Sequence, residues 1–417
     1  MKAGPQAPGG YSRRDFLKLT AAAGLATAAA PRLRAAVPIR PFEVSASLYA
    51  WDLHDEGVER ILDNLQGMAA VNSVYLIGVM HPERRPLGGG SFPHNPVRPT
   101  WTAEDARCYW HPDPARYGRI KPRLSDHAWL SQTDWVRTLV DAARRRGLKV
   151  GVENSHALVD KARAEGEFAD CVGRDIHGGI INVRPWLRPL CPNHPDVRAY
   201  ATALYSELVA SYGIDYAMSA IVSFEQGGPD RGSCFCASCH RAAREQGFDL
   251  AAAQRALLAD PAAEPARAEW EAFRVESTAR FYQAIHAAIH ALKPDIDLRY
   301  NRHMSGDAAA WGIKLSALQP QLDSIRYQDY SEQTGDPALM PGKRRAFLAA
   351  RAELGPQYPL LGAIGVRLRA TPNLIREGVR IAVETKMTGI TLGHYDGATF
   401  PMLRAVRAGL GDAGITV

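Results

Sequence analysis

Eight short runs rich in β-branched and aromatic residues recur along the chain, and helical periodicity follows most of them. Strand–helix units in this order predict a closed parallel barrel rather than an open doubly wound sheet. We therefore expect an α/β fold of the TIM, or (β/α)8, barrel class. It would carry a long loop after the second strand, residues 81–125, and a cysteine-rich loop after the fourth. The expected strands are Glu43–Leu53, Ser73–Met80, Leu148–Glu153, Tyr216–Phe224, Asp297–Asn301, Leu322–Gln328, Tyr358–Val366 and Gly389–His394.

The N-terminus reads SRRDFLK at residues 12–18, and an apolar, alanine-rich run from Leu19 to Ala30 follows. This pattern is typical of a twin-arginine signal peptide. We expect residues 1–36 to be the signal and residues 37–417 to be the barrel domain. The export machinery would then be a partner, and the destination would be the periplasm or the extracellular space. Beyond the N-terminus no apolar run reaches the length of a membrane span, so no stable span is expected after signal removal.

The basic balance of the chain belongs mostly to its N-terminus. The net charge is +6, and removing residues 1–36 leaves about +1. We therefore expect no nucleic-acid partner. Neither a GxGxxG nor a GxxxxGK[ST] motif follows any expected strand, which argues against a nucleotide site.

Carboxylates stand at the ends of several expected strands, where a barrel of this class places its chemistry. Glu225 ends the fourth strand, Asp329 follows the sixth and Asp396 follows the eighth. Glycoside hydrolysis needs one protonated carboxylic acid and a second carboxylate opposite it. We expect Glu225 to be the acid, because the apolar strand that precedes it would raise its pKa by desolvation. Asp396 or Asp329 would be the second carboxylate.

Aromatic and polar side chains accompany these carboxylates at the strand ends. Aromatic rings stack on the apolar face of a pyranose, and amides, carboxylates and imidazoles bind its hydroxyls. We therefore expect a carbohydrate substrate. The expected substrate-binding residues are Tyr49, Trp51, Glu153, Asn154, His156, Tyr300, Asn301, His303, Tyr327, Tyr330, His394 and Tyr395.

Six cysteines are present, and three of them form the run Cys234-x-Cys236-x-x-Cys239. These three could hold one tetrahedral ion, and Cys191, about one strand–helix unit upstream, could supply the fourth thiolate. We predict a structural zinc site, since four thiolates leave no open position for a substrate. Alternatives are His240 as fourth ligand, or disulfides between Cys191 and Cys234 or Cys236, as in many exported proteins. Cys108 and Cys171 stay unassigned.

Glu225, the CxCxxC run, and the segment CPNHPDVR that begins at Cys191 together resemble the β-galactosidases of glycoside hydrolase family 42. The resemblance covers roughly residues 185–245 and implies a (β/α)8 barrel in which Glu225 is the acid/base. It also implies that Cys191, Cys234, Cys236 and Cys239 bind zinc. Two features depart from the family: Phe224 stands where the family has asparagine, and the seventh expected strand lacks the nucleophilic glutamate. The second carboxylate would therefore lie on another strand.

The sequence thus favours an exported glycoside hydrolase-like enzyme that acts on a sugar or oligosaccharide by carboxylate acid/base catalysis. One alternative is a metal-dependent sugar isomerase, epimerase or lyase. Its metal would be held by Glu153, His156, Glu225 and either His303 or His394. A second alternative is a barrel that binds carbohydrate without turnover, because the strand-seven acid is missing.

Overall fold

The computed structural model describes residues 41–416, apart from 221–223, 225–232 and 303–310. Within these ranges, eight parallel strands close into a barrel in the order β1-β10-β9-β8-β7-β6-β3-β2. This confirms the predicted TIM-barrel class. The strands are β1 (Glu43–Leu48), β2 (Ser73–Val79), β3 (Lys149–Asn154), β6 (Tyr216–Ala220), β7 (Asp297–Arg302), β8 (Ser324–Tyr327), β9 (Leu360–Gly365) and β10 (Gly389–Gly393).

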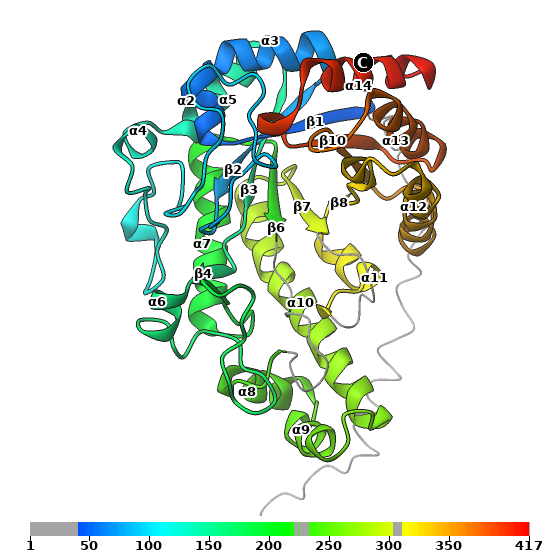
Figure 1. The fold of residues 1–417 in the computed structure, drawn as a ribbon. Coiled ribbons are helices and arrows are strands. Elements are labelled where there is room, and N and C mark those ends of the chain that lie inside the picture. Colours follow the sequence, from blue (N-terminus) through cyan, green and yellow to red (C-terminus); the bar gives the residue numbers. More distant parts are fainter. Residues whose placement is uncertain (1–40, 221–223, 225–232, 303–310, 417) are drawn as a thin grey trace, which may run out of the picture. The chain divides into compact units, whose positions relative to one another are not determined.

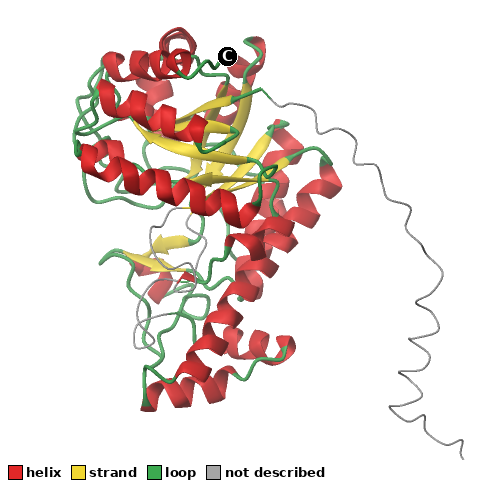
Figure 2. Ribbon diagram, turned by 90° about the vertical axis from the view of Figure 1, so that its right-hand side faces the viewer, coloured by secondary structure: helices red, strands yellow, loops and turns green. Residues whose placement is uncertain are grey.

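Helices cover the outer surface of the barrel (Figures 1 and 2). α3 packs beside α14, α14 beside α13, and α13 beside α12, while the long α10 packs against α7. The helices are α2 (Ala50–Glu56), α3 (Val58–Ala69), α4 (Ala128–Ser131), α5 (Trp135–Arg145), α6 (Lys161–Glu165), α7 (Pro195–Tyr212), α8 (Ala237–Gln246), α9 (Leu250–Ala259), α10 (Glu264–Leu292), α11 (Leu315–Leu318), α12 (Met340–Leu354), α13 (Pro372–Glu384) and α14 (Phe400–Asp412).

Short elements complete the loops of the barrel, most of them after the carboxyl ends of the strands. β4 (Leu158–Asp160) and β5 (Leu187–Pro189) form a small antiparallel sheet of their own. α8 and α9 follow the fourth barrel strand, β6, and pack against each other. The 3-10 turns are η1 (Pro114–Arg116), η3 (Gln319–Gln321), η4 (Ser331–Thr334), η5 (Pro337–Leu339) and η6 (Tyr395–Gly397).

The first strand is shorter than predicted, because a helix begins inside the expected range. β1 ends at Leu48, and α2 begins at Ala50. Asp52 causes this change, since its Oδ2 accepts a hydrogen bond from the Tyr49 backbone N–H at 2.8 Å. A carboxylate on the third helical residue satisfies one of the free N–H groups of a helix start. Trp51 and Asp52 therefore belong to a helix rather than to a strand end.

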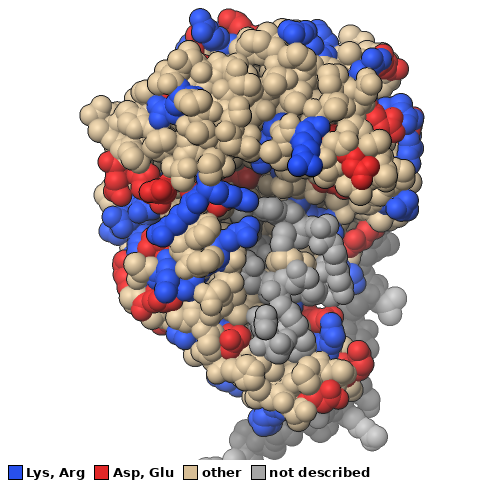
Figure 3. Space-filling view, in the orientation of Figure 1, with Lys and Arg blue, Asp and Glu red and all other residues tan. Residues whose placement is uncertain are grey.

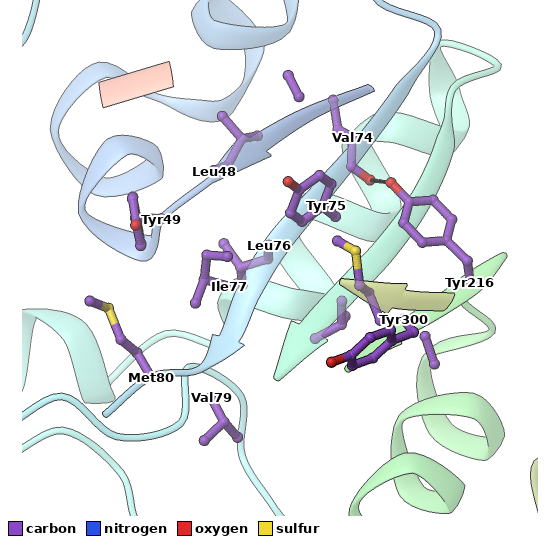
Figure 4. Close-up of a cluster of buried hydrophobic side chains, with 14 of the residues drawn as sticks. Leu48, Tyr49, Val74, Tyr75, Leu76, Ile77, Val79, Met80, Tyr216 and Tyr300 are labelled. Carbon is purple, nitrogen blue, oxygen red and sulfur yellow. Dashed lines mark hydrogen bonds between the residues drawn. The ribbon is translucent and has the colours of Figure 1, made fainter. Parts of the chain in front are cut away.

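A polar plug fills the barrel near the amino ends of its strands. The Tyr216 hydroxyl donates to the Val74 carbonyl at 2.9 Å, as Figure 4 shows. Gly151 makes room for this ring, since a Cβ there would lie 2.3 Å from it. The Arg299 guanidinium stacks on the same ring and donates to Glu43 Oε1 at 2.8 Å. Burial alone would raise the pKa of Glu43, but Arg299 and Lys149 lower it to about 2.

A fully buried ion pair ties β9 to α12. Lys343 Nζ donates to Glu332, to the Ala363 carbonyl at 2.7 Å and to the Asp329 carbonyl at 2.8 Å. Both side chains of the pair are shielded from solvent. The other Glu332 oxygen, Oε2, accepts from the Gly365 N–H at 3.1 Å. The pair thereby holds the carboxyl ends of β8 and β9 in place.

Replacing Lys343 by methionine is expected to lower the free energy of unfolding by about 3–5 kcal/mol, because Glu332 would be left as an uncompensated buried acid. Urea unfolding measures this loss. Lys314→Met is the matched control, because Lys314 is exposed, and it should change the free energy by no more than about 0.5 kcal/mol. The double variant Lys343→Met, Glu332→Leu should recover part of the loss. Equal stability of Lys343→Met and the parent would show that the pair contributes nothing.

Candidate active site

Asp396 is a buried carboxylate at the mouth of the barrel. It lies in η6, directly after β10, and its side chain is 1% exposed. Neither of its oxygens has a hydrogen-bond partner among the described residues. Burial raises its pKa to about 6, although the nearby Arg367 opposes the shift. A buried carboxyl without partners is costly for a fold, so its position calls for a functional explanation.

Asp52 lies close enough to Asp396 for the two charges to repel each other. Its Oδ1 also lacks a partner, while Oδ2 is held by the Tyr49 N–H. Burial, and then the charge of Asp396, raise the pKa of Asp52 well above its ordinary value. Two carboxyls that share one water-poor pocket cannot easily ionise together. At least one of them therefore keeps its proton at a pH where an isolated carboxyl would have lost it.

A third carboxylate, Glu153, belongs to a hydrogen-bonded network inside the barrel. Its Oε1 accepts from Asn301 Nδ2 at 3.2 Å, and its Oε2 is buried without a partner among the described residues. Asn301 Oδ1 in turn accepts from Arg326 Nη1 at 2.7 Å. Arg326 also donates to Thr391 Oγ1 at 2.6 Å and to the Tyr330 hydroxyl. Burial raises the pKa of Glu153, and Arg326 counteracts this effect.

Tyr49, Tyr330 and His394 bring rings to the same mouth. The Tyr49 and His394 ring centroids are 5.2 Å apart, and those of Tyr330 and His394 are 6.5 Å apart. His394 Nδ1 lies 2.6 Å from the Ser47 hydroxyl. A Cβ at Gly393 would lie 2.0 Å from the Tyr330 hydroxyl, so this close approach requires glycine. Burial, and then the charges of Asp396, Glu153 and Asp52, raise the pKa of Tyr49 well above its ordinary value, and Arg367 opposes this shift.

Four of the predicted substrate-binding aromatics serve the packing of the barrel. Tyr300 packs on Tyr282 of α10, and Tyr327 packs on Phe347 of α12. Their side chains point outward because their strand neighbours point into the lumen, and side chains alternate along a strand. Trp51 is fully buried beneath the Tyr49 ring. The hydroxyl of the buried Tyr395 donates to Glu56 at 3.0 Å.

His156 and Asn154 lie at the end of β3, and both are buried. Burial lowers the pKa of His156 to about 4, so its ring is neutral at physiological pH. Its Nε2 and both polar side-chain atoms of Asn154 lack partners among the described residues. Within that part of the chain, no group of three potential metal ligands includes Glu153, His156 or His394. Glu225 and His303, two further ligands of the metal-dependent alternative, lie outside the described residues, so that alternative stays a hypothesis.

The remaining predicted residues differ in how far they can be placed. Asp329 is partly exposed, and its Oδ1 accepts from the Ser331 N–H at 3.0 Å and from the Ser331 hydroxyl at 2.6 Å. Glu225 and His303 lie outside the described residues. The sequence interpretation missed Asp52, Arg326 and Arg367. For Asp52 a signal existed, since an acidic residue three positions after a helix cap is typical of a helix start.

The four predicted cysteine ligands converge. Cys191 Sγ lies 3.4 Å from Cys236 Sγ, 3.5 Å from Cys239 Sγ and 3.8 Å from Cys234 Sγ. Four ligands about 2.3 Å from a tetrahedral zinc would be about 3.8 Å apart, so the arrangement fits such an ion. A disulfide needs sulfur atoms about 2 Å apart, and all six cysteines are unpaired. The disulfide alternative is therefore wrong for this structure.

Nearby donors also reach the sulfur atoms of this cluster. Asn193 Nδ2 donates to Cys239 Sγ at 3.3 Å, and the Arg174 N–H points at Cys234 Sγ from 3.4 Å. Hydrogen bonds among the four thiols lower the pKa of Cys236 and raise the pKa of Cys191, and burial raises the pKa of Cys239. Four buried cysteines with such donors could hold a metal ion, as the sequence predicted.

Figure 3 shows one face of the molecule, on which acidic and uncharged side chains interrupt the basic ones. None of the described helices is both long and apolar enough to cross a membrane.

Solved structures share this fold. The glycoside hydrolase domain of PgaB (BpsB) from Bordetella bronchiseptica matches 90% of this chain and 97% of that domain, with a TM-score of 0.58 and 15% identity. A β-galactosidase from Bacillus circulans sp. alkalophilus matches 88% of the chain at 14% identity and a TM-score of 0.58. A catalytic mutant of Gan42B, a GH42 β-galactosidase from G. stearothermophilus, matches 90% of the chain at 13% identity and a TM-score of 0.59.

This chain therefore shares its barrel fold with these solved glycoside hydrolases. The chain spans only 55% and 57% of the lengths of the two β-galactosidases. Identities this low show the fold alone. Among curated proteins, none matches the chain in sequence.

Residues 10–30 match the model of the twin-arginine translocation pathway signal sequence. The chain therefore carries the export signal that its sequence predicted. The signal implies the twin-arginine machinery as a partner and the periplasm or the extracellular space as the destination.

Proposed function

We propose that this chain is an exported glycoside hydrolase that acts on a β-linked sugar or oligosaccharide. The observation that carries the proposal is Asp396, a buried carboxyl at the mouth of a glycoside hydrolase-like barrel, for which the described residues offer no hydrogen-bond partner. Its raised pKa and the proximity of Asp52 suit the exchange of a proton with a substrate or a water molecule. The fold shared with a glycoside hydrolase domain of nearly the same length supports this reading.

In this proposal Glu225 protonates the leaving oxygen, as its position after β6 and the resemblance to family 42 suggest. Asp396 activates water or stabilises the oxocarbenium-like transition state, with Asp329 as the alternative second carboxylate. Tyr49, Tyr330 and His394 bind the sugar ring, while Glu153, Asn154, Asn301 and His156 bind its hydroxyls. Asp52 lies beside Asp396 and holds the proton that these two carboxyls retain.

We also propose that Cys191, Cys234, Cys236 and Cys239 hold a structural zinc ion. Four thiolates fill a tetrahedral site, so this ion would stabilise the loop between β6 and α8 and would take no part in the reaction. The converging sulfur atoms and the Asn193 hydrogen bond to Cys239 support this role.

The function is tested by incubating the purified chain with a panel of β-linked oligosaccharides and aryl glycosides. Glu225→Gln should lower kcat on oligosaccharides by about 10²–10⁴-fold, because the leaving oxygen loses its proton donor. The loss should be much smaller for aryl glycosides whose leaving groups need no proton. Glu104→Gln is the control, because Glu104 is exposed in a loop. Sugar binding without turnover by the parent would contradict the proposal and would favour the binding barrel.

A further inference from the structure

Two histidines and one aspartate converge near the amino ends of the barrel strands, opposite the candidate active site. His286 and His290 lie one turn apart near the end of α10, which Figure 1 shows beside β7, and Asp323 immediately precedes β8. His290 Nε2 lies 2.9 Å from Asp323 Oδ2, and His286 Nε2 lies 3.8 Å from Asp323 Oδ1. All three side chains are partly exposed, so solvent ions can reach them.

The hydrogen bonds of His290 determine where its proton lies. Its Nδ1 is 3.0 Å from the carbonyl of Pro294, and a carbonyl oxygen can only accept, so Nδ1 carries the hydrogen. In the neutral ring, Nε2 then directs a lone pair at Asp323 Oδ2. That oxygen is itself held by the Leu298 N–H at 2.8 Å. Two lone pairs this close need a cation between them, either a proton or a metal ion.

His286 distinguishes the metal from the proton. Its ring stacks on the His290 ring with centroids 3.9 Å apart. A proton on His290 would use only one of the two imidazoles, whereas a metal ion would use both together with the carboxylate. Two imidazole nitrogens and a carboxylate thus offer three ligand atoms that lie within 4.8 Å of one another.

We propose that His286, His290 and Asp323 form a binding site for a divalent transition-metal ion, separate from the cysteine cluster. Imidazole and carboxylate ligands suit Zn²⁺, Co²⁺, Ni²⁺ or Cu²⁺ better than Ca²⁺ or Mg²⁺. Histidines at i and i+4 share one helix face and bind one ion readily. The bound ion links the end of α10 to the segment before β8, at the end of the barrel that serves stability rather than chemistry.

A comparable group on another loop lacks these features. In the cluster of Asp170, Cys171 and His194, the Nδ1 of His194 accepts from the Asp196 N–H at 3.2 Å, so Nε2 carries the proton. Arg119 also donates to both oxygens of Asp170, at 2.8 and 2.7 Å. The Arg119 guanidinium already occupies the carboxylate, and the Nε2–H of His194 offers no lone pair, so this cluster leaves no place for a metal ion.

The test first loads the cysteine cluster with one equivalent of zinc, which four thiolates bind in preference to two imidazoles and a carboxylate. It then titrates Co²⁺ into the full chain and follows visible absorption and heat. The protein is produced without a histidine tag, because such a tag would itself bind cobalt. We expect one further equivalent of cobalt, whose spectrum has d–d bands but no thiolate-to-cobalt charge transfer. The double variant His286→Gln, His290→Gln should weaken this binding by about 100-fold or more, and Asp323→Asn should weaken it as well.

His177→Gln is the matched control, because His177 is exposed and belongs to none of the metal-binding groups, and it should bind cobalt like the parent. Circular dichroism verifies that each variant is folded. Equal cobalt binding by the parent and the double variant would overturn the proposal. So would a parent that binds cobalt only with thiolate charge transfer, since that ion would sit in the cysteine cluster.

Discussion

Replacing Cys239 by alanine is expected to abolish metal binding by the four-cysteine cluster and to unfold the segment around α8, while the barrel stays folded. Cys239 is fully buried, and its sulfur lies 3.5 Å from that of Cys191. For small zinc domains the metal contributes about 10–16 kcal/mol of apparent binding free energy, which is also folding free energy. The segment has only a small hydrophobic cluster of its own, in which Phe235 stacks on Trp270.

Metal analysis and hydrogen exchange measure the two effects together. The parent should contain one zinc per chain at the cluster, and Cys239→Ala should contain none. Amide protection should fall in α8 and α9 but not in β1–β3. Cys108→Ala is the control, because Cys108 is buried and its thiol bonds to the Trp110 carbonyl away from the cluster. Unchanged protection in α8 after metal loss would show that the ion has no structural role.

A milder substitution near the cluster should give a graded response. Asn193 donates to the Cys239 sulfur and also to the Ser277 hydroxyl at 3.0 Å. Arg198 donates to Asn193 Oδ1 at 3.1 Å and so fixes the orientation of the amide. Asn193→Ala should lower zinc affinity by about 10–100-fold without unfolding α8 at saturating metal, as expected for a residue that orients a ligand.

The barrel was predictable because its evidence is repeated along the chain. Each strand is a short apolar run, and each error in a boundary leaves the order of the units unchanged. The cysteine cluster was predictable for a different reason: its ligands are rare residues at characteristic spacings. The small β4–β5 sheet was missed, because strands of three residues carry no periodic signal.

The candidate site was harder to predict, because it depends on the direction of single side chains. Tyr300 and Asn301 are adjacent, yet one packs under α10 and the other binds Glu153 in the lumen. Sequence alone does not tell which of two neighbours on a doubly covered strand points inward. Asp52 was hidden for a related reason, since the alternation of residues 43–53 resembled one continuous strand.

Asp396→Asn is expected to lower kcat/KM for sugar hydrolysis by about 10³-fold and at the same time to stabilise the protein at neutral pH. The loss of activity follows because an amide cannot exchange the proton that the reaction requires. In the parent, kcat/KM should show an ionisation near pH 6, where the buried Asp396 titrates. Rates on the glycoside panel as a function of pH measure both effects. Asp63→Asn, an exposed aspartate, is the control.

The gain in stability follows from the direction of the pKa shift. The pKa of Asp396 is about 6 in the folded chain and 3.8 for an ordinary aspartate, so the folded state holds the proton more tightly. The stability due to this proton is fully present below pH 3.8 and is lost as the pH rises through 6. Asparagine carries no charge at any pH, so the melting temperature of Asp396→Asn should exceed that of the parent at pH 8 and approach it at pH 4.

Other outcomes would reassign the residue. Loss of activity without a gain in stability at pH 8 would mean that Asp396 is paired in solution, although it has no hydrogen-bond partner among the described residues. A gain in stability with full activity would make Asp396 a buried charge without a catalytic role. In that case Asp329→Asn should abolish turnover, because Asp329 is the other carboxylate proposed for the second position. Stability and activity thus have to change in opposite directions at one residue, a result that a purely structural carboxylate would not produce.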